Sequence, residues 1–292
     1  NGKRLSQIYT LYNSGFMINY RLKNDSFEQL IDTKNLNFYW KGKMPKIERE
    51  MVDARQRATT RYYSLNGNTD YISKTSIQYE EMPIDENIKW MAFNQKFFTA
   101  SIISENGFSK GIISLMPSKN DETVKEGALS SEIPFTDFLD NQAHFKYFFG
   151  PNKYNILNQV TEGFSQNIEL GWLFLPFINK YLIIPIFNFL EHFMSNYGLI
   201  IIVMVLIIRL ILSPLTYKSH ISMAKMRVLK PELDAIREKH DGDMQKAQPD
   251  QLELYRKVGI NPLSGCIPVL LQFPILVSLF YFIPSAIELR LE

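Results

Sequence analysis

A single arginine inside a long apolar run carries the most specific chemistry in the sequence. Arg209 is the one charged residue of residues 197–215, a stretch of 19 residues. Its guanidinium cannot lose its proton, and a charge within a hydrocarbon span costs roughly 2.5–3.5 kcal/mol on insertion scales. Ser213, Thr216 and His220 follow at spacings of four, seven and eleven residues, which places them on the same side of a helix. This pattern predicts either a hydrated recess around Arg209 or a side chain that snorkels to the membrane surface.

A second apolar run, residues 266–287, has 22 residues and no charge. Gln272 is its one strongly polar side chain, and Phe273 follows it directly. Small polar residues at helical spacing in such a run more often pack helices together than touch a substrate. Cys266 is interpreted as a packing residue near the membrane boundary rather than as a redox site.

Other reactive patterns are weak. Residues 107–111 match G-x-S-x-G, but a nucleophile elbow needs a helix after its serine, and the residues that follow favour a strand. The dipeptide Asn106-Gly107 instead predicts a β-hairpin between strands at 97–104 and 111–115. One cysteine and four histidines without metal-ligand spacing exclude a multi-cysteine metal or iron–sulfur site. We therefore expect no catalytic residue, no metal site and no cofactor.

The overall composition is an average over two regions of the chain that differ in charge and hydropathy. The 292 residues include 32 Lys+Arg and 30 Asp+Glu, and this balance argues against a dedicated nucleic-acid binder. Charges are spread evenly through residues 1–170, whereas later charges gather mainly in an island at 218–257 that lies between the apolar runs. Both runs are long enough to cross a bilayer, so a membrane protein is predicted. The first residue is Asn1 and no signal peptide is visible, so we expect a piece of a longer polypeptide.

The predicted order is an outer β-rich domain, an interfacial helix and two spans joined by a polar hairpin. Residues 1–170 contain strand-like runs, for example at 71–79. Residues 171–196 are apolar and aromatic but carry a polar stripe, which suits a helix in the membrane interface; a third span is the alternative. Pro176 and Pro185 are expected to kink or divide this helix.

Residues 216–260 predict a helical hairpin, and residues 261–292 a second span with its exit. In the hairpin, apolar residues from Met223 to Ile236 recur every three or four positions, residues 241–243 form a turn, and Gly259 ends the second helix. The functional interpretation is a docking arm for cytoplasmic partners or anionic lipids, and the alternative is a solvated helix pair. Four cations follow the first span without an acidic residue before Glu232, which places the hairpin in the cytoplasm and residues 1–170 in the periplasm. These cations are Lys218, Lys225, Arg227 and Lys230.

Several ordered motifs make the chain similar to a known family. They include Gly171-Trp172-Leu173, Ile208-Arg209, Ser213-Pro214-Leu215-Thr216, Ser222-Met223-Ala224-Lys225-Met226, Asn261-Pro262-Leu263, Gly265-Cys266, Gln272-Phe273-Pro274-Ile275 and Glu288-Leu289-Arg290. The chain resembles the YidC branch of the YidC/Oxa/Alb family of membrane protein insertases, in its Bacteroidetes-like form. The resemblance is strong over residues 150–292 and holds only in kind and position before that.

The resemblance implies a periplasmic β-supersandwich domain, an amphipathic interfacial helix and the first two helices of a five-helix membrane core. It also implies that the family's first transmembrane helix and the last three core helices lie outside this chain. The implied activity is insertion and folding of integral membrane proteins, alone or with the Sec translocon, without an enzymatic step. Nascent membrane proteins, ribosomes or targeting factors, and lipids are the implied partners of an inner-membrane protein.

A client groove is implied as well, with Arg209 as its arginine. Its other candidate residues are Val205, Ser213, Thr216, Gln272 and Phe273. The family usually has threonine where this chain has Val205, so one polar contact of the groove is absent. Two rival classes are weighed against an insertase. A transporter or receptor subunit requires a ligand pocket in the outer domain, and an intramembrane enzyme requires catalytic residues in the spans, where none is visible.

Overall fold

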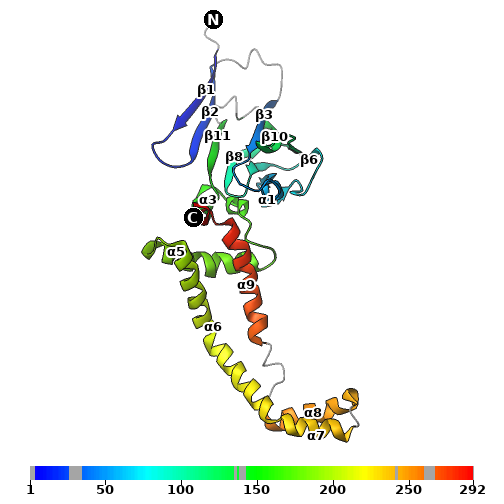
Figure 1. Ribbon diagram of the computed structural model, residues 1–292. Coiled ribbons are helices and arrows are strands. Elements are labelled where there is room, and N and C mark those ends of the chain that lie inside the picture. Colours follow the sequence, from blue (N-terminus) through cyan, green and yellow to red (C-terminus); the bar gives the residue numbers. More distant parts are fainter. Residues whose placement is uncertain are drawn as a thin grey trace. The chain divides into compact units, whose positions relative to one another are not determined.

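The computed structural model describes residues 4–25, 35–134, 137, 143–240, 243–259 and 267–291. They fall into two compact units. The β unit comprises Asn1–Glu169 together with Ser285–Leu291, and the helical unit comprises Leu170–Pro284 (Figure 1). The predicted order of a β-rich domain followed by helices is confirmed. Asn261, Pro262 and Cys266, to which the sequence assigned roles, lie outside the described residues.

The described strands of the β unit form two antiparallel sheets. Seven strands form one sheet in the order β1-β2-β11-β8-β7-β4-β5, and four form the other in the order β3-β10-β9-β6. The strands are β1 Arg4–Leu11, β2 Met17–Asp25, β3 Asn35–Pro45, β4 Thr59–Ser64, β5 Thr69–Tyr71, β6 Glu80–Ile84, β7 Ile88–Asn94, β8 Phe98–Phe108, β9 Gly111–Pro117, β10 Thr123–Pro134 and β11 His144–Pro151.

The two sheets face each other across an aromatic core. Along β10 every second side chain is buried from Lys125 to Ile133, as expected for a strand with one face inward. Phe93 of β7 reaches across to β3, where its ring lies 5.0 Å from that of Trp40, centroid to centroid. A Cβ added at Gly127 of β10 would lie 2.7 Å from the Phe93 ring, so glycine is what admits this ring. The predicted β-sandwich is therefore confirmed.

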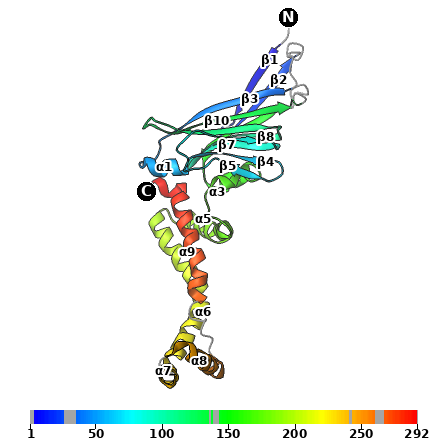
Figure 2. The same ribbon diagram turned by 90° about the vertical axis from the view of Figure 1, so that its right-hand side faces the viewer.

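Short helices cover other surfaces of the β unit. These are α1 Met51–Arg57, α3 Tyr154–Val160 and the 3₁₀ turn η2 Phe164–Asn167. The Phe164 ring lies 5.1 Å from the rings of both Trp90 and Phe148. Trp90 also donates its indole N–H to the carbonyl of Glu162, 3.1 Å away. This aromatic cluster fixes the segment after β11 against the seven-stranded sheet, beside which α3 is seen in Figure 2.

The hairpin predicted at Asn106-Gly107 is wrong. Strand β8 continues through both residues to Phe108, and β9 belongs to the other sheet. Gly107 does adopt a positive φ of 87°, but it does so in a bulge, where the pairing of β7 with β8 shifts register. The dipeptide thus provides the left-handed residue that it favours, but in a bulge and not in a hairpin turn. The chain crosses from the seven-stranded to the four-stranded sheet about two residues later.

The strand predicted at 71–79 is also wrong beyond its first residue. Strand β5 ends at Tyr71, and the amide of Ser76 donates to the carbonyl of Ser73 in a turn. Ile72 is buried in the core, and Lys125 donates to the carbonyl of Lys74 at 2.7 Å. Tertiary contacts therefore hold this segment as a loop despite its β-branched and aromatic residues.

The helical unit begins with a divided helix. It consists of α4 Leu175–Ile178, the π-helical turn η3 Asn179–Ile183 and α5 Ile184–Phe193. Pro185 lies in the first turn of α5, two residues after the last residue of the π-helical turn, where its missing N–H cannot take part in the regular ladder. The interruption predicted near Pro185 is confirmed, whereas Pro176 lies in the first turn of α4 and does not divide the helix. Its exposed aromatic side chains are Trp172, Phe174, Phe177, Tyr181, Phe189 and Phe193.

The remaining helices are α6 Tyr197–Val228, α7 Lys230–Lys239, α8 Met244–Val258 and α9 Ile267–Ser285, with the 3₁₀ turn η5 Ile287–Leu291 after α9. Helix α6 continues 13 residues past Leu215. The sequence placed Met223 and Ile236 on one hairpin helix, which is wrong, because α7 restarts with Pro231 in its first turn. Gly259 ends α8 with a φ of 68°, as predicted.

Candidate functional site: a groove between α6 and α9

Helix α6 starts at a well-defined cap and stays apolar for most of its length. The Asn196 side chain accepts a hydrogen bond from the Leu199 amide at 2.9 Å, which satisfies one of the free N–H groups of the first turn. Within the described residues, α6 and α9 are both long and apolar enough to cross a membrane. Only 17% of each most apolar window is buried, so neither helix is the enclosed core of a water-soluble fold.

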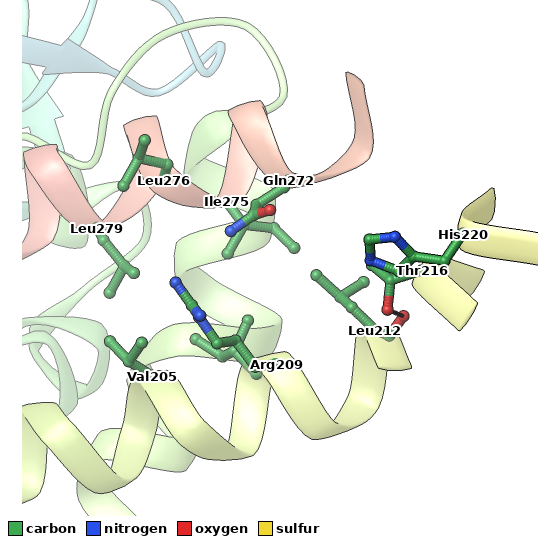
Figure 3. Close-up of a pocket in the computed structure, with 10 residues that line it drawn as sticks. Val205, Arg209, Leu212, Thr216, His220, Gln272, Ile275, Leu276 and Leu279 are labelled. Atoms are coloured by element: carbon green, nitrogen blue, oxygen red, sulfur yellow. Dashed lines mark hydrogen bonds between the residues drawn. The ribbon is translucent and has the colours of Figure 1, made fainter. Parts of the chain in front are cut away.

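A cavity of about 360 Å³ lies between α6 and α9. Figures 1 and 2 both show α9 alongside the first half of α6, and Figure 3 shows the lining side chains. The α6 residues that line it are Val205, Ile208, Arg209, Leu212, Thr216 and His220; those of α9 are Gln272, Ile275, Leu276 and Leu279. We call this cavity the α6–α9 groove. Its wall is mainly aliphatic, with four polar side chains set into it.

Arg209 is the only cation among the groove residues. In Figure 3 its guanidinium extends from α6 into the space between the helices, and the Gln272 side chain points into the same space from α9. Within the described part of the chain, Arg209 makes neither a hydrogen bond nor an ion pair. The apolar segments of α6 and α9 contain no Asp or Glu. The charge is thus left available to an anionic or strongly polar group that enters the groove.

Four of the six candidate groove residues line the cavity, namely Val205, Arg209, Thr216 and Gln272. Ser213 and Phe273 are exposed but are not among its lining residues. Ser213 contributes its carbonyl instead, which accepts the Thr216 hydroxyl at 2.9 Å. The hydroxyl proton of Thr216 is therefore used in a hydrogen bond within α6, so toward the groove this side chain can only accept hydrogen bonds.

Six groove residues were not among the candidates, namely Ile208, Leu212, His220, Ile275, Leu276 and Leu279. A signal for them exists, because Gln272, Ile275, Leu276 and Leu279 are spaced i, i+3, i+4 and i+7, and one helix face carries such a set. His220 was recognised as part of the polar stripe but was not assigned to the groove. The spacing alone cannot identify which of several apolar faces meets another helix.

The four cations assigned to the hairpin lie on α6 and at the start of α7, and all four are exposed. Within the described residues, Lys218, Lys225, Arg227 and Lys230 form no ion pair. A carboxylate caps the N-terminus of α8. Asp243 accepts from the amide of Lys246 at 3.3 Å and from that of Gln245 at 3.0 Å, and the contact with Lys246 is the main cause that lowers the pKa of Asp243. In the described part of the chain, no group of three or more His, Cys, Asp or Glu side chains is placed to hold a metal ion.

Comparison with known proteins covers both units. A family model described as the YidC periplasmic domain matches residues 1–185, and one described as the 60Kd inner membrane protein matches residues 189–292. Proteins named membrane protein insertase YidC are 44% identical over 98% of the chain in Amoebophilus asiaticus, 38% over 100% in Cytophaga hutchinsonii and 32% over 99% in Parabacteroides distasonis. These alignments cover 48%, 49% and 47% of those proteins, so the chain spans about half the length of the curated relatives it matches.

Proposed function

Because the chain belongs to the YidC family of membrane protein insertases, we propose that it forms the periplasmic domain and part of the client groove of such an insertase. The observation that carries the proposal is Arg209 in the α6–α9 groove, which has no hydrogen-bond or ion-pair partner among the residues that the structure describes. A cation without an acidic partner is costly in hydrocarbon, so a site that keeps one needs water or a polar client segment there.

The proposed orientation follows from the distribution of cations. Lys218, Lys225 and Arg227 extend from the end of the apolar part of α6, and positive charge is retained on the cytoplasmic side. The hairpin α7–α8 is then cytoplasmic and the β unit periplasmic. In this orientation Thr216 and His220 line the cytoplasmic part of the groove, below Arg209.

The proposed mechanism shortens the apolar path of a polar segment through the membrane. A polar or acidic tail of the client enters the groove from the cytoplasm and is attracted by Arg209 and Gln272. The client's apolar helix follows along the exposed aliphatic and aromatic side chains of α9, such as Leu276 and Phe280. Burial of that helix in lipid releases about 25 cal/mol per Å² of apolar surface, so no nucleotide and no covalent step is required.

We assign the proposed partners separately to the membrane-spanning helices and to the cytoplasmic hairpin. Nascent membrane proteins occupy the groove, alone or as they leave the Sec translocon, and lipids surround α6 and α9. The four exposed cations around the start of the hairpin suit a polyanionic surface, such as a ribosome or the anionic inner leaflet, or an acidic targeting factor.

Replacement of Arg209 in the full-length protein tests the proposal. Arg209→Ala is expected to reduce the insertion of a client with an acidic translocated tail about tenfold, whereas Arg209→Lys retains the charge and most of the rate. A version of the same client with an uncharged tail serves as the control, and its insertion is expected to change less than twofold. Equal insertion of the acidic client by the wild-type protein and Arg209→Ala would exclude this role for the arginine.

A further inference from the structure

The α6–α9 groove contains a second polar position, to which the proposed mechanism assigns no contact with the client. His220 lines the groove and is exposed, and within the described part of the chain it makes no hydrogen bond, ion pair or ring contact. In Figure 3 its ring lies beyond Thr216, at the end of the lining that is far from Val205. The imidazole is therefore available to a group that enters the groove at this end.

Arg209 and His220 lie on the same side of α6. The helix continues from Tyr197 to Val228, through Pro214, so a separation of eleven residues makes about three turns. Three turns bring the side chain back to within about 20° of the same direction, and both residues line one cavity. At about 1.5 Å of rise per residue, the two positions are about 17 Å apart along the helix.

Between these two positions, α6 offers the groove no further hydrogen-bond donor. Leu212 is aliphatic, and the Thr216 hydroxyl donates within the helix, for example to the Leu212 carbonyl at 3.2 Å. Across the groove, α9 contributes Gln272 and three aliphatic side chains. The donors of the groove thus occupy two levels, one where Arg209 and Gln272 point into the same space and one at His220 (Figure 3).

The charged groups around His220 are cationic. Among the described residues that line the groove, Arg209 and His220 are the titratable ones, and the lining residues of α9 are uncharged. The charged residues of α6 nearest to His220 in the sequence are Lys218 and Lys225, and the charged residues of α7 and α8 are not among the lining residues. A protonated imidazole at this position therefore has no carboxylate partner within the described lining, and an acidic side chain of a client can provide one.

The two levels fit an extended segment that carries two acidic residues. An extended chain rises about 3.3 Å per residue, so about 17 Å corresponds to about five residues. Two carboxylates at this spacing reach Arg209 and His220 at the same time. Two carboxylates that are two residues apart are separated by about 7 Å, which brings only one of them to a cationic level.

We propose that His220 is a specificity-determining residue of the α6–α9 groove: together with Arg209 it selects a client tail whose two acidic residues are about five positions apart. This inference rests on the proposed function, because it concerns the tail that is attracted by Arg209. Histidine changes its charge between about pH 5 and 8, so the selection strengthens as the pH falls through this range.

Clients that differ only in the spacing of two aspartates test the inference. The full-length protein is reconstituted in proteoliposomes, and the insertion rate is measured for a single-span client with aspartates five or two residues apart in an otherwise uncharged tail. At pH 6 the five-residue spacing is expected to be inserted at least fivefold faster, and at pH 8 this ratio should fall below about twofold. His220→Gln should abolish the difference at both pH values, whereas His220→Arg, with its permanent charge, should retain it at both.

A relocated histidine provides the control. Tyr217 is exposed on α6 but does not line the groove, so Tyr217→His combined with His220→Gln keeps the number of imidazoles and should not restore the difference. Equal insertion of the two clients by the wild-type protein, a difference that is the same at pH 6 and 8, or a difference that His220→Gln retains overturns the inference.

A client with a single aspartate separates this inference from the proposed function. If Arg209→Ala inserts that client at the wild-type rate, the proposed role of the arginine fails. If Arg209→Ala slows that client while the spacing of two aspartates has no effect in the wild-type protein, only the role of His220 is overturned.

Discussion

The ammonium group of Lys125, on β10, donates a hydrogen bond to the carbonyl of Ala58 at 2.9 Å, across 67 residues of sequence. Lys125 is 1% exposed, and the same ammonium binds the carbonyl of Lys74 at 2.7 Å. One buried side chain thus connects the end of α1 to the loop after β5. The terminal ammonium group of a lysine has three donors, which suffice for both carbonyls.

This contact predicts an unusual pH dependence for the β unit. Burial lowers the pKa of Lys125 to about 8, and burial together with nearby cations lowers that of Lys74 to about 8 as well. The unfolded chain holds these protons up to about pH 10.5, so between pH 8 and 10 it binds more protons than the native state does. Stability is therefore expected to rise over this window, seen as an increase of Tm in thermal unfolding. In Lys125→Met the rise should be smaller, and an equal slope in both proteins would contradict the assignment.

Gly127 is expected to tolerate no side chain. A Cβ there would lie 2.7 Å from both the Phe93 ring and the Thr60 methyl group, inside the packed sandwich. Gly127→Ala should cost about 1–3 kcal/mol of unfolding free energy, because an overpacked core must move its neighbours. Ala128→Ser, on the opposite face of the same strand, is the control and should change stability by less than about 0.5 kcal/mol. Chemical denaturation of the two variants measures the difference, and similar midpoints would refute the packing argument.

Groove residues are expected to contact a nascent client, and exposed residues of α6 outside the groove are not. Photo-crosslinking probes at Val205 and Leu276 line the groove and should form adducts with a stalled membrane-protein nascent chain. A probe at Leu206, which is 54% exposed but does not line the groove, should give a several-fold lower yield. Phe273 is exposed outside the cavity, so a probe there reports on the lipid-facing path along α9. Equal yields at Val205 and Leu206 would rule out the groove as the client's position.

The exposed cations at the start of the hairpin are expected to support binding to a polyanionic surface. Replacement of Lys218, Lys225, Arg227 and Lys230 by glutamine should reduce cosedimentation of the full-length protein with ribosomes at least tenfold at low salt and flatten its salt dependence. Lys246 and Lys257 are also exposed but pair with Asp243 and Glu253, so their replacement by glutamine is the control and should have little effect. If both sets of replacements weaken binding alike, net charge rather than this cluster accounts for it.

Sequence patterns gave correct predictions where a single helix determines the structure. Run length and the scarcity of charge predicted the apolar helices. Helical spacing placed Arg209 and Thr216 on one face of α6, and both line the cavity, whereas Gln272 was assigned to the groove by the family resemblance. Pro185 likewise predicted an interruption of its helix, because a missing N–H acts within its own turn, whereas Pro176 lies in the first turn of α4 and interrupts nothing.

The errors arose where distant parts of the chain overrule local preference. Asn106-Gly107 favours left-handed backbone, which serves a bulge as well as a hairpin, and only the partner strands select between them. The same limit applies to Arg290, since nothing near it in the sequence indicates that Glu48 is its ion-pair partner.

Composition, hydropathy and run length were enough to predict a β-rich half, two apolar helices and an arginine that has no acidic partner in the apolar runs. The pairing of strands into sheets and the face of α9 that meets α6 could be read only from the folded chain. The difference lies in the range of the interactions involved. Helical periodicity, capping and hydropathy act within a few residues, whereas the sandwich and the groove join residues far apart in the sequence, where many pairings satisfy the same local rules.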